Sequence, residues 1–101
     1  MTKRLTVIKV KGDTDELLRH KAEVMDPVFE DKVGQYGGLA HITARTDDGV
    51  LIVNLWESEE GSEQAFQDPE IQEALKSLDD QLSPETERNH YEVVDYRMPQ
   101  G

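Results

Sequence analysis

A short turn between two β-rich segments is the feature that most constrains the fold of this chain. Residues 39–45 and 50–56 are rich in apolar and β-branched side chains, and they flank the sequence Thr-Asp-Asp-Gly at positions 46–49. An Asp-Gly pair between two such segments is a strong local signal for a β-hairpin, because glycine accepts the positive φ of a tight turn. The sequence therefore predicts an antiparallel pair of strands in the middle of the chain.

The turn also determines which side chains of this hairpin share a face. With Asp48-Gly49 as the two-residue loop, the opposed pairs are His41 with Trp56, Thr43 with Asn54, and Arg45 with Ile52, and opposed residues point to the same side of a sheet. One face is therefore mixed, with His41, Thr43, Arg45, Ile52, Asn54 and Trp56. The other face is apolar and suits packing against helices; it has Ala40, Ile42, Ala44, Leu51, Val53 and Leu55. A loop of Asp47-Asp48 would shift the partners and keep the faces, whereas a three-residue loop with a bulge would blur them.

Two helical regions surround the hairpin in the sequence. Over residues 17–33 the apolar side chains recur at three- and four-residue spacing, as on one face of a helix. The members of this stripe are Leu18, Ala22, Met25, Phe29 and Val33. A kink or break is expected near Asp26, because Pro27 follows it and proline lacks the N–H that a helix needs. A second stripe covers residues 65–78, with an internal restart expected at Asp68-Pro69.

The outer segments complete the fold prediction. Residues 5–10 predict a first strand, residues 83–85 a short turn and residues 90–98 a last strand. The order strand, helix, strand, strand, helix, strand is typical of the ferredoxin-like α+β fold, a four-stranded antiparallel sheet with helices on one face. Such a sheet leaves its second face bare, and a homodimer that stacks two sheets would cover it.

Composition limits the partners of this chain. Its 101 residues predict a single domain over positions 1–101, and 22 acids against 11 bases give a net charge of −11. Such a charge repels nucleic acid and anionic membrane surfaces, so neither is expected as a partner. There are no cysteines, and the histidines at 20, 41 and 90 show no short spacing, so no metal site is expected. No apolar segment approaches the length of a membrane span, which favours a cytoplasmic location.

The third strand and the segment after it resemble a known superfamily. Residues 53–58 read Val-Asn-Leu-Trp-Glu-Ser, an acidic helical segment with Ala65-Phe66 follows, and a Gly-Gly pair precedes the second strand. Together with the element order, these residues resemble the antibiotic-biosynthesis monooxygenase-like branch of the dimeric α/β-barrel superfamily. The resemblance implies a homodimer with a cleft between sheet and helices in each subunit. Some members oxidise aromatic polyketides with oxygen and without metal or flavin, while others degrade haem, isomerise lactones or only bind ligands.

Haem degradation does not fit this sequence. Members with that activity use an asparagine in the first strand, a tryptophan in the third and a histidine on the following helix. Trp56 matches the tryptophan, but the first strand has no asparagine, and the helix has Phe66 and Gln67 where the histidine would stand.

The mixed face of the hairpin supplies the candidate site. We expect His41 to act as a base on an acidic phenol or enol, Asn54, Thr43 and Arg45 to donate hydrogen bonds to the resulting anion, and Trp56 to stack on its ring. Each residue also has a structural interpretation: Trp56 as a core anchor, His41 as a hydrogen-bonded imidazole, Asn54 and Thr43 as a cross-strand pair, and Arg45 as a solvent-facing side chain.

The sequence therefore predicts a small-molecule-binding homodimer, a cofactor-independent monooxygenase or isomerase for an aromatic or polyketide-like substrate. The alternatives are a non-catalytic ligand-binding or stress-related protein of the same fold, and a structural dimer whose mixed face is the interface.

Overall fold

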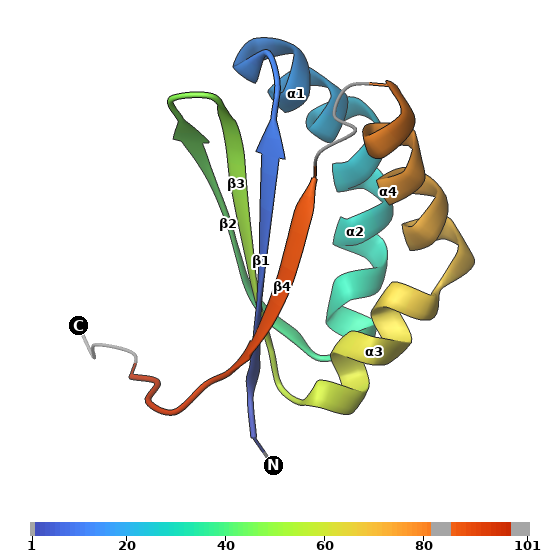
Figure 1. The fold of residues 1–101 in the computed structure, drawn as a ribbon. Coiled ribbons are helices and arrows are strands. Elements are labelled where there is room, and N and C mark those ends of the chain that lie inside the picture. The colour runs from blue at the N-terminus through green and yellow to red at the C-terminus, as the bar shows by residue number, and fades with distance from the viewer. Residues whose placement is uncertain (1, 82–85, 98–101) are drawn as a thin grey trace, which may run out of the picture.

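The fold is a four-stranded antiparallel sheet with all helices on one of its faces (Figure 1). The computed structural model describes residues 2–81 and 86–97. The elements in chain order are β1 (Arg4–Lys11), α1 (Thr14–His20), the π-helical turn η1 (Lys21–Met25), α2 (Asp26–Lys32), the 3₁₀ turn η2 (Val33–Tyr36), β2 (Gly38–Thr46), β3 (Gly49–Trp56), α3 (Glu59–Gln67), α4 (Pro69–Gln81) and β4 (Glu87–Glu92). The strand order is β2-β3-β1-β4, which confirms the predicted ferredoxin-like architecture.

The first helical region is one continuous rod with an irregular turn in its middle. Asp13 caps α1 by accepting a hydrogen bond from the Glu16 amide. The π-helical turn η1 follows and ends directly before α2, in which Pro27 occupies the first turn. Because proline cannot donate the next regular bond, the helix widens in the turn before it. The expected irregularity near Asp26 is therefore confirmed, and it takes the form of a π-helical turn.

The second helical region begins and restarts at side-chain caps. The Ser58 hydroxyl accepts from the Gly61 amide at the start of α3. The carboxylate of Asp68 accepts from the amides of Glu70 and Ile71 at the start of α4. The restart predicted at Asp68-Pro69 is confirmed, because the cap and the following proline together favour a new helix there.

The central hairpin turns one residue earlier in the sequence than predicted, and this changes which residues lie opposite each other. His41 lies opposite Asn54, Thr43 opposite Ile52 and Thr46 opposite Gly49. The loop is therefore Asp47-Asp48, and the expected pairing of His41 with Trp56 is wrong. Gly49 instead belongs to the sheet.

The neighbouring strand explains why the glycine is not in the turn. A Cβ on Gly49 would collide with the carbonyl group of Val10 on β1. The Gly12 amide also donates to the Asp48 carbonyl group, 2.9 Å away. The close approach of β1 therefore requires the glycine one position later than a tight Asp-Gly turn would place it.

The two faces of the hairpin have the predicted residues, but the helices cover the mixed face and leave the apolar face bare. Ile52 and Trp56 of the mixed face are buried beneath the helices, whereas Ile42 of the apolar face is 59% exposed. The expectation that the apolar face packs against the helices is therefore wrong. The large side chains of the mixed face lie on central strand β3, where the helices cover them, and its polar residues lie mostly on edge strand β2.

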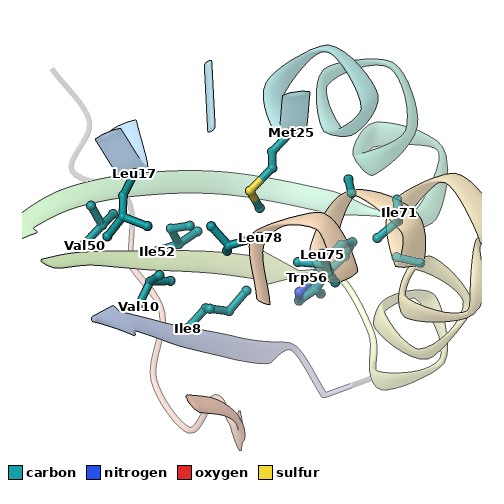
Figure 2. Close-up of a cluster of buried hydrophobic side chains, with 12 residues drawn as sticks. Ile8, Val10, Leu17, Met25, Val50, Ile52, Trp56, Ile71, Leu75 and Leu78 are labelled. Atoms are coloured by element: carbon teal, nitrogen blue, oxygen red, sulfur yellow. The ribbon is translucent and has the colours of Figure 1, made fainter. Parts of the chain in front are cut away.

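The core lies between the helices and the central strands β1 and β3. Figure 2 shows side chains from both layers meeting there. The buried apolar members of this cluster are Ile8, Val10, Leu17, Met25, Val50, Ile52, Trp56, Ala65, Ile71, Ala74, Leu75 and Leu78. No helix in the described part of the chain is long and apolar enough to cross a membrane.

The last strand begins earlier and ends earlier than the sequence suggested. β4 covers Glu87–Glu92 rather than residues 90–98, because its partner β1 begins at Arg4, which lies opposite Glu92. One further hydrogen bond joins the Val93 amide to the Lys3 carbonyl group at 2.9 Å. The following segment then runs away from the helices (Figure 1). The turn predicted at residues 83–85 and the end of the predicted strand at Met98 lie outside the described residues.

Candidate functional site

A cleft opens between the start of edge strand β2 and the helical rod that runs through η1 and α2. Its volume is about 290 Å³, near the lower end for small-molecule sites. Phe29 and Val33 form an apolar wall on the helical side of the cleft, and Leu39 lines the strand side. The lining residues with titratable side chains are Lys21, Asp26, Glu30 and His41.

Both ring nitrogens of His41 are hydrogen bonded. Nδ1 lies 2.6 Å from Oδ1 of Asn54, and Nε2 lies 3.1 Å from Oγ1 of Thr43. An amide oxygen can only accept, so Nδ1 carries the proton and donates it to Asn54. In the neutral ring, Nε2 therefore holds a lone pair that accepts from the Thr43 hydroxyl. A ring oriented in this way can take a proton at Nε2, because the hydroxyl can turn and accept instead.

Asn54 is the polar group at the bottom of the site. It is 1% exposed, and its Nδ2 has no hydrogen-bond partner among the described residues. An unpaired buried N–H of this kind costs about 1–3 kcal/mol. Beside it lies an inner pocket of about 10 Å³, close to the space that one water-sized group needs. Four residues line both this pocket and the larger cleft, so the two adjoin: Lys21, Asp26, Phe29 and His41.

Lys21 is a site residue that the sequence pattern did not reveal. It is 8% exposed, and its Nζ lies 2.6 Å from Oδ1 of Asp26. The predicted apolar stripe passed through Ala22, but Ala22 is exposed and Lys21 is buried in its place. The π-helical turn causes this shift, since it changes which residues face the sheet. Pro27 was the available signal, because a proline marks the place where a regular helical stripe cannot be extrapolated.

Two of the predicted site residues lie elsewhere. Trp56 has no exposed surface; its Nε1 donates to Oγ1 of Thr6 at 3.1 Å, and Phe66 packs against it edge to face. Arg45 forms an exposed ion pair with Asp15 at 3.1 Å. The structure therefore brings His41, Thr43 and Asn54 together. Of the five predicted residues, His41 lines the cleft and the inner pocket, Asn54 lines the inner pocket, and Thr43, Trp56 and Arg45 line neither.

A second histidine, His90, lies on the same face of the sheet at the opposite edge, on β4. Nδ1 of His90 is 2.9 Å from Oγ1 of Thr6, and its ring packs edge to face on Phe66. Burial lowers the pKa of His90 and the nearby Arg4 charge adds to this effect, while Glu63 opposes it. Thr6 therefore joins His90 to Trp56 in one hydrogen-bonded chain.

Within the described residues, no group of three or more histidine and acidic side chains could hold a metal ion.

Comparison with known proteins identifies the fold. No family model and no curated protein matches this sequence. Among solved structures, a dimeric ferredoxin-like protein from an uncultured marine organism has a TM-score of 0.79 at 15% identity, over 99% of this chain and 95% of that one. A candidate antibiotic biosynthesis monooxygenase from Nitrosomonas europaea has a TM-score of 0.72 at 10% identity, over 91% and 90%.

A third solved structure has an activity in its name. It is a variant of SnoaB, a cofactor-independent oxygenase from Streptomyces nogalater, with a TM-score of 0.68 at 16% identity over 98% of this chain and 97% of that one. Identities this low establish architecture rather than activity. The chain therefore has the ferredoxin-like α+β fold that these solved structures share.

Proposed function

We propose that this chain forms a homodimer whose cleft binds an aromatic or polyketide-like molecule and acts on it as a cofactor-independent monooxygenase or isomerase. The observation that carries the proposal is the position of His41, which lines the cleft while Asn54 and Thr43 hold its ring. The shared fold of a cofactor-independent oxygenase supports this choice of chemistry.

The proposed reaction begins with proton transfer to His41. Nε2 takes a proton from an acidic phenol or enol, so that an O–H bond breaks, an N–H bond forms and the electron pair stays on the substrate. The imidazolium keeps its Nδ1–H bond to Asn54, and the Thr43 hydroxyl turns to accept from Nε2. General-base catalysis of this kind contributes about 10²–10⁴-fold to a rate.

The substrate anion then supplies the electrons for the second step. In an oxygenase a methylene carbon of the anion loses two hydrogens and gains one atom of dioxygen as a carbonyl oxygen, and the other atom leaves as water. In an isomerase the imidazolium returns the proton to a carbon of the anion, so that a C–H bond forms in place of the O–H bond that broke. Neither route needs a bound cofactor, because the substrate itself is the reductant or is unchanged in oxidation state.

The proposed substrate contacts are fewer than the sequence suggested. Thr43 and Asn54 remain, because both touch His41. Arg45 is paired with Asp15 at the surface and Trp56 is buried in the core, so neither is part of the proposed contact set.

The proposed dimer uses the bare face of the sheet. Ile42 on β2 and Tyr91 on β4 are 59% and 53% exposed there, and Val94 in the segment after β4 is 92% exposed. A second copy of this chain would bury these side chains by stacking sheet on sheet. The dimeric state of the ferredoxin-like protein from the marine organism supports this occupant.

Oxygen consumption tests the proposed activity. With a hydroxyanthrone as substrate, we expect the protein to accelerate oxygen uptake and quinone formation in buffer treated with a metal chelator. His41→Gln keeps a hydrogen-bonding side chain and removes the base, so turnover should fall by about 10²-fold or more with similar binding. His20→Gln is the matched control, since His20 lies on α1 against Ser77 of α4 and does not line the cleft.

Two outcomes contradict the catalytic proposal. Equal loss of activity in both histidine variants would show that the effect is not specific to His41. Saturable binding to the wild-type protein without any turnover would identify the non-catalytic ligand-binding alternative.

A further inference from the structure

We propose that the inner pocket is an oxyanion site, in which Lys21 and Asn54 hold the deprotonated oxygen of a ligand that enters the cleft as a neutral acid. This inference rests on the proposed function and names the chemical class of its substrate: a planar phenol or enol whose anion is delocalised.

Lys21 has unused donor capacity in a buried position. It is 8% exposed, and its hydrogen-bond partner within the described residues is Asp26, with Nζ and Oδ1 2.6 Å apart. An ammonium group has three N–H donors, so the bond to Asp26 leaves two for a ligand, and Lys21 is one of the residues that line the inner pocket. Burying an ammonium group is costly unless it is paired and fully hydrogen bonded, and a ligand oxygen would complete its bonding.

Asn54 supplies the second donor from the opposite layer. Its Nδ2 is buried and has no partner within the described residues, while its Oδ1 accepts from His41. Lys21 comes from the helical rod and Asn54 from the sheet, and both line the same pocket of about 10 Å³. That volume suits one oxygen atom. Two donor-bearing side chains that line one small pocket from opposite layers can stabilise a developing negative charge there.

Other residues that line the inner pocket indicate what kind of ligand bears this oxygen. Met25 and Phe29 offer apolar surface beside the pocket, suited to the flat body of an aromatic ligand. The proton of the bound acid passes to Nε2 of His41, with the O–H bond broken, the N–H bond formed and the electron pair left on oxygen.

The charges that face the pocket favour a ligand that arrives neutral. Asp26 carries one negative charge next to Lys21, and Glu30 lines the outer cleft. With Lys21 ionised and His41 neutral, these four titratable groups sum to one negative charge. A carboxylate arriving with a full charge meets this repulsion. A phenol or enol enters neutral and passes its proton to His41, so it adds no net charge to the site.

The protonation state of a bound chromogenic phenol tests the inference. 4-Nitrophenol changes its visible absorption on ionisation, so its titration can be followed inside the protein. We expect the apparent pKa of the bound phenol to lie at least about one unit below its value in water, a tenfold preference for the anion. Benzoate, which brings a full negative charge into the site, should bind at least about tenfold more weakly than the phenol.

Three variants separate the contribution of Lys21 from that of overall charge. Lys21→Met combined with Asp26→Asn removes the ammonium without leaving an unpaired carboxylate, and the pKa of the bound phenol should return to its value in water or rise above it. Asn54→Leu should remove at least about half of the shift. Lys76→Met removes one positive charge on the exposed face of α4 and should leave the shift intact.

The outcomes also separate this inference from the proposed function. A bound phenol that titrates as in water, no binding at millimolar phenol, or an equal effect of Lys76→Met would each overturn the oxyanion site. An intact shift together with no turnover of the anthrone would keep the oxyanion site and reject the oxygenase or isomerase. If the Lys21 variant is folded by circular dichroism and turns over the anthrone as fast as the wild type, the oxyanion site is rejected and the proposed function is kept.

Discussion

Asn54 of β3 and Thr6 of β1 are buried polar residues that lie opposite each other on the helical face of the sheet. Asn54 orients His41, and its Nδ2 has no hydrogen-bond partner among the described residues. Thr6 has no exposed surface, accepts from Trp56 and bonds to His90. Its hydroxyl is satisfied on both sides, since it can accept from the indole and donate to the imidazole. The first arrangement leaves a donor for a ligand, whereas the second is closed and stabilises the fold.

Thr6→Val should destabilise the protein without changing the shape of the site. Valine has nearly the same volume, but it leaves the buried indole N–H of Trp56 unpaired, which costs about 1–3 kcal/mol. Urea unfolding followed by the fluorescence of Trp56 measures this loss. Thr46→Val, at the exposed end of β2, should change the free energy of unfolding by less than about 0.5 kcal/mol. Equal effects of the two substitutions would contradict the role assigned to Thr6.

At the scale of secondary-structure elements, one carboxylate joins three segments of the helical layer. Asp68 caps α4 and accepts from Lys32 of α2 at 2.9 Å and from Tyr36 of η2 at 2.7 Å. The bond from Lys32, followed by the bond from Tyr36, holds the pKa of Asp68 well below its ordinary value. These contacts fix the end of the rod that forms the helical wall of the cleft.

Asp68→Asn should lower the midpoint of thermal unfolding at neutral pH, because asparagine can still cap α4 but does not pair with the Lys32 charge. A depressed carboxyl pKa stabilises the fold above the pKa of the unfolded chain, and this stabilisation is lost as the pH falls toward the lower folded value. The difference between variant and wild type should therefore be full above about pH 5 and shrink below about pH 4.

The matched control for this prediction is Asp31→Asn on α2, because the side chain of Asp31 is exposed. It should unfold with nearly the wild-type midpoint at every pH. A difference between Asp68→Asn and wild type that persists unchanged in acid would show that the Lys32 charge does not account for the stabilisation.

At the scale of the whole molecule, the unequal faces of the sheet point to assembly. The helices cover one face, and the other presents apolar side chains with half or more of their surface exposed at Ile42 and Tyr91. The segment after β4 adds exposed Val94 and runs away from the helices (Figure 1). Such exposure is costly in water and is relieved when a second copy covers it.

Ile42→Asp should convert the proposed dimer to a monomer. A carboxylate at position 42 would be buried between the stacked sheets without a partner, which opposes association. Light scattering after size exclusion should give twice the chain mass of 11.5 kDa for the wild type and the single mass for the variant. Val24→Asp introduces the same charge at an exposed apolar residue of η1 and should leave the dimer intact. A wild-type protein of single mass at micromolar concentration would contradict the dimer.

The sequence by itself determined the elements and the side chains that share a hairpin face. Caps such as Ser58 and Asp68 act through hydrogen bonds within a few residues, so local composition is enough to locate them. The alternation of β3 likewise keeps Asn54 and Trp56 on one face whatever the register, because a strand has a strict period of two. His41, Thr43 and Asn54 could therefore be grouped from the sequence alone.

The tertiary structure alone decided which of those faces the helices cover, where the hairpin turns and which residues meet at the cleft. Both faces of the hairpin are apolar enough to pack, and the choice depends on what the remaining elements bury together. The loop moved to Asp47-Asp48 because β1 approaches Gly49, a contact between distant parts of the chain. Lys21 lies at the site because of the π-helical turn before Pro27. A regular helical period does not describe such a turn. Contacts of this kind depend on packing in three dimensions, whereas a sequence pattern reports only its own period.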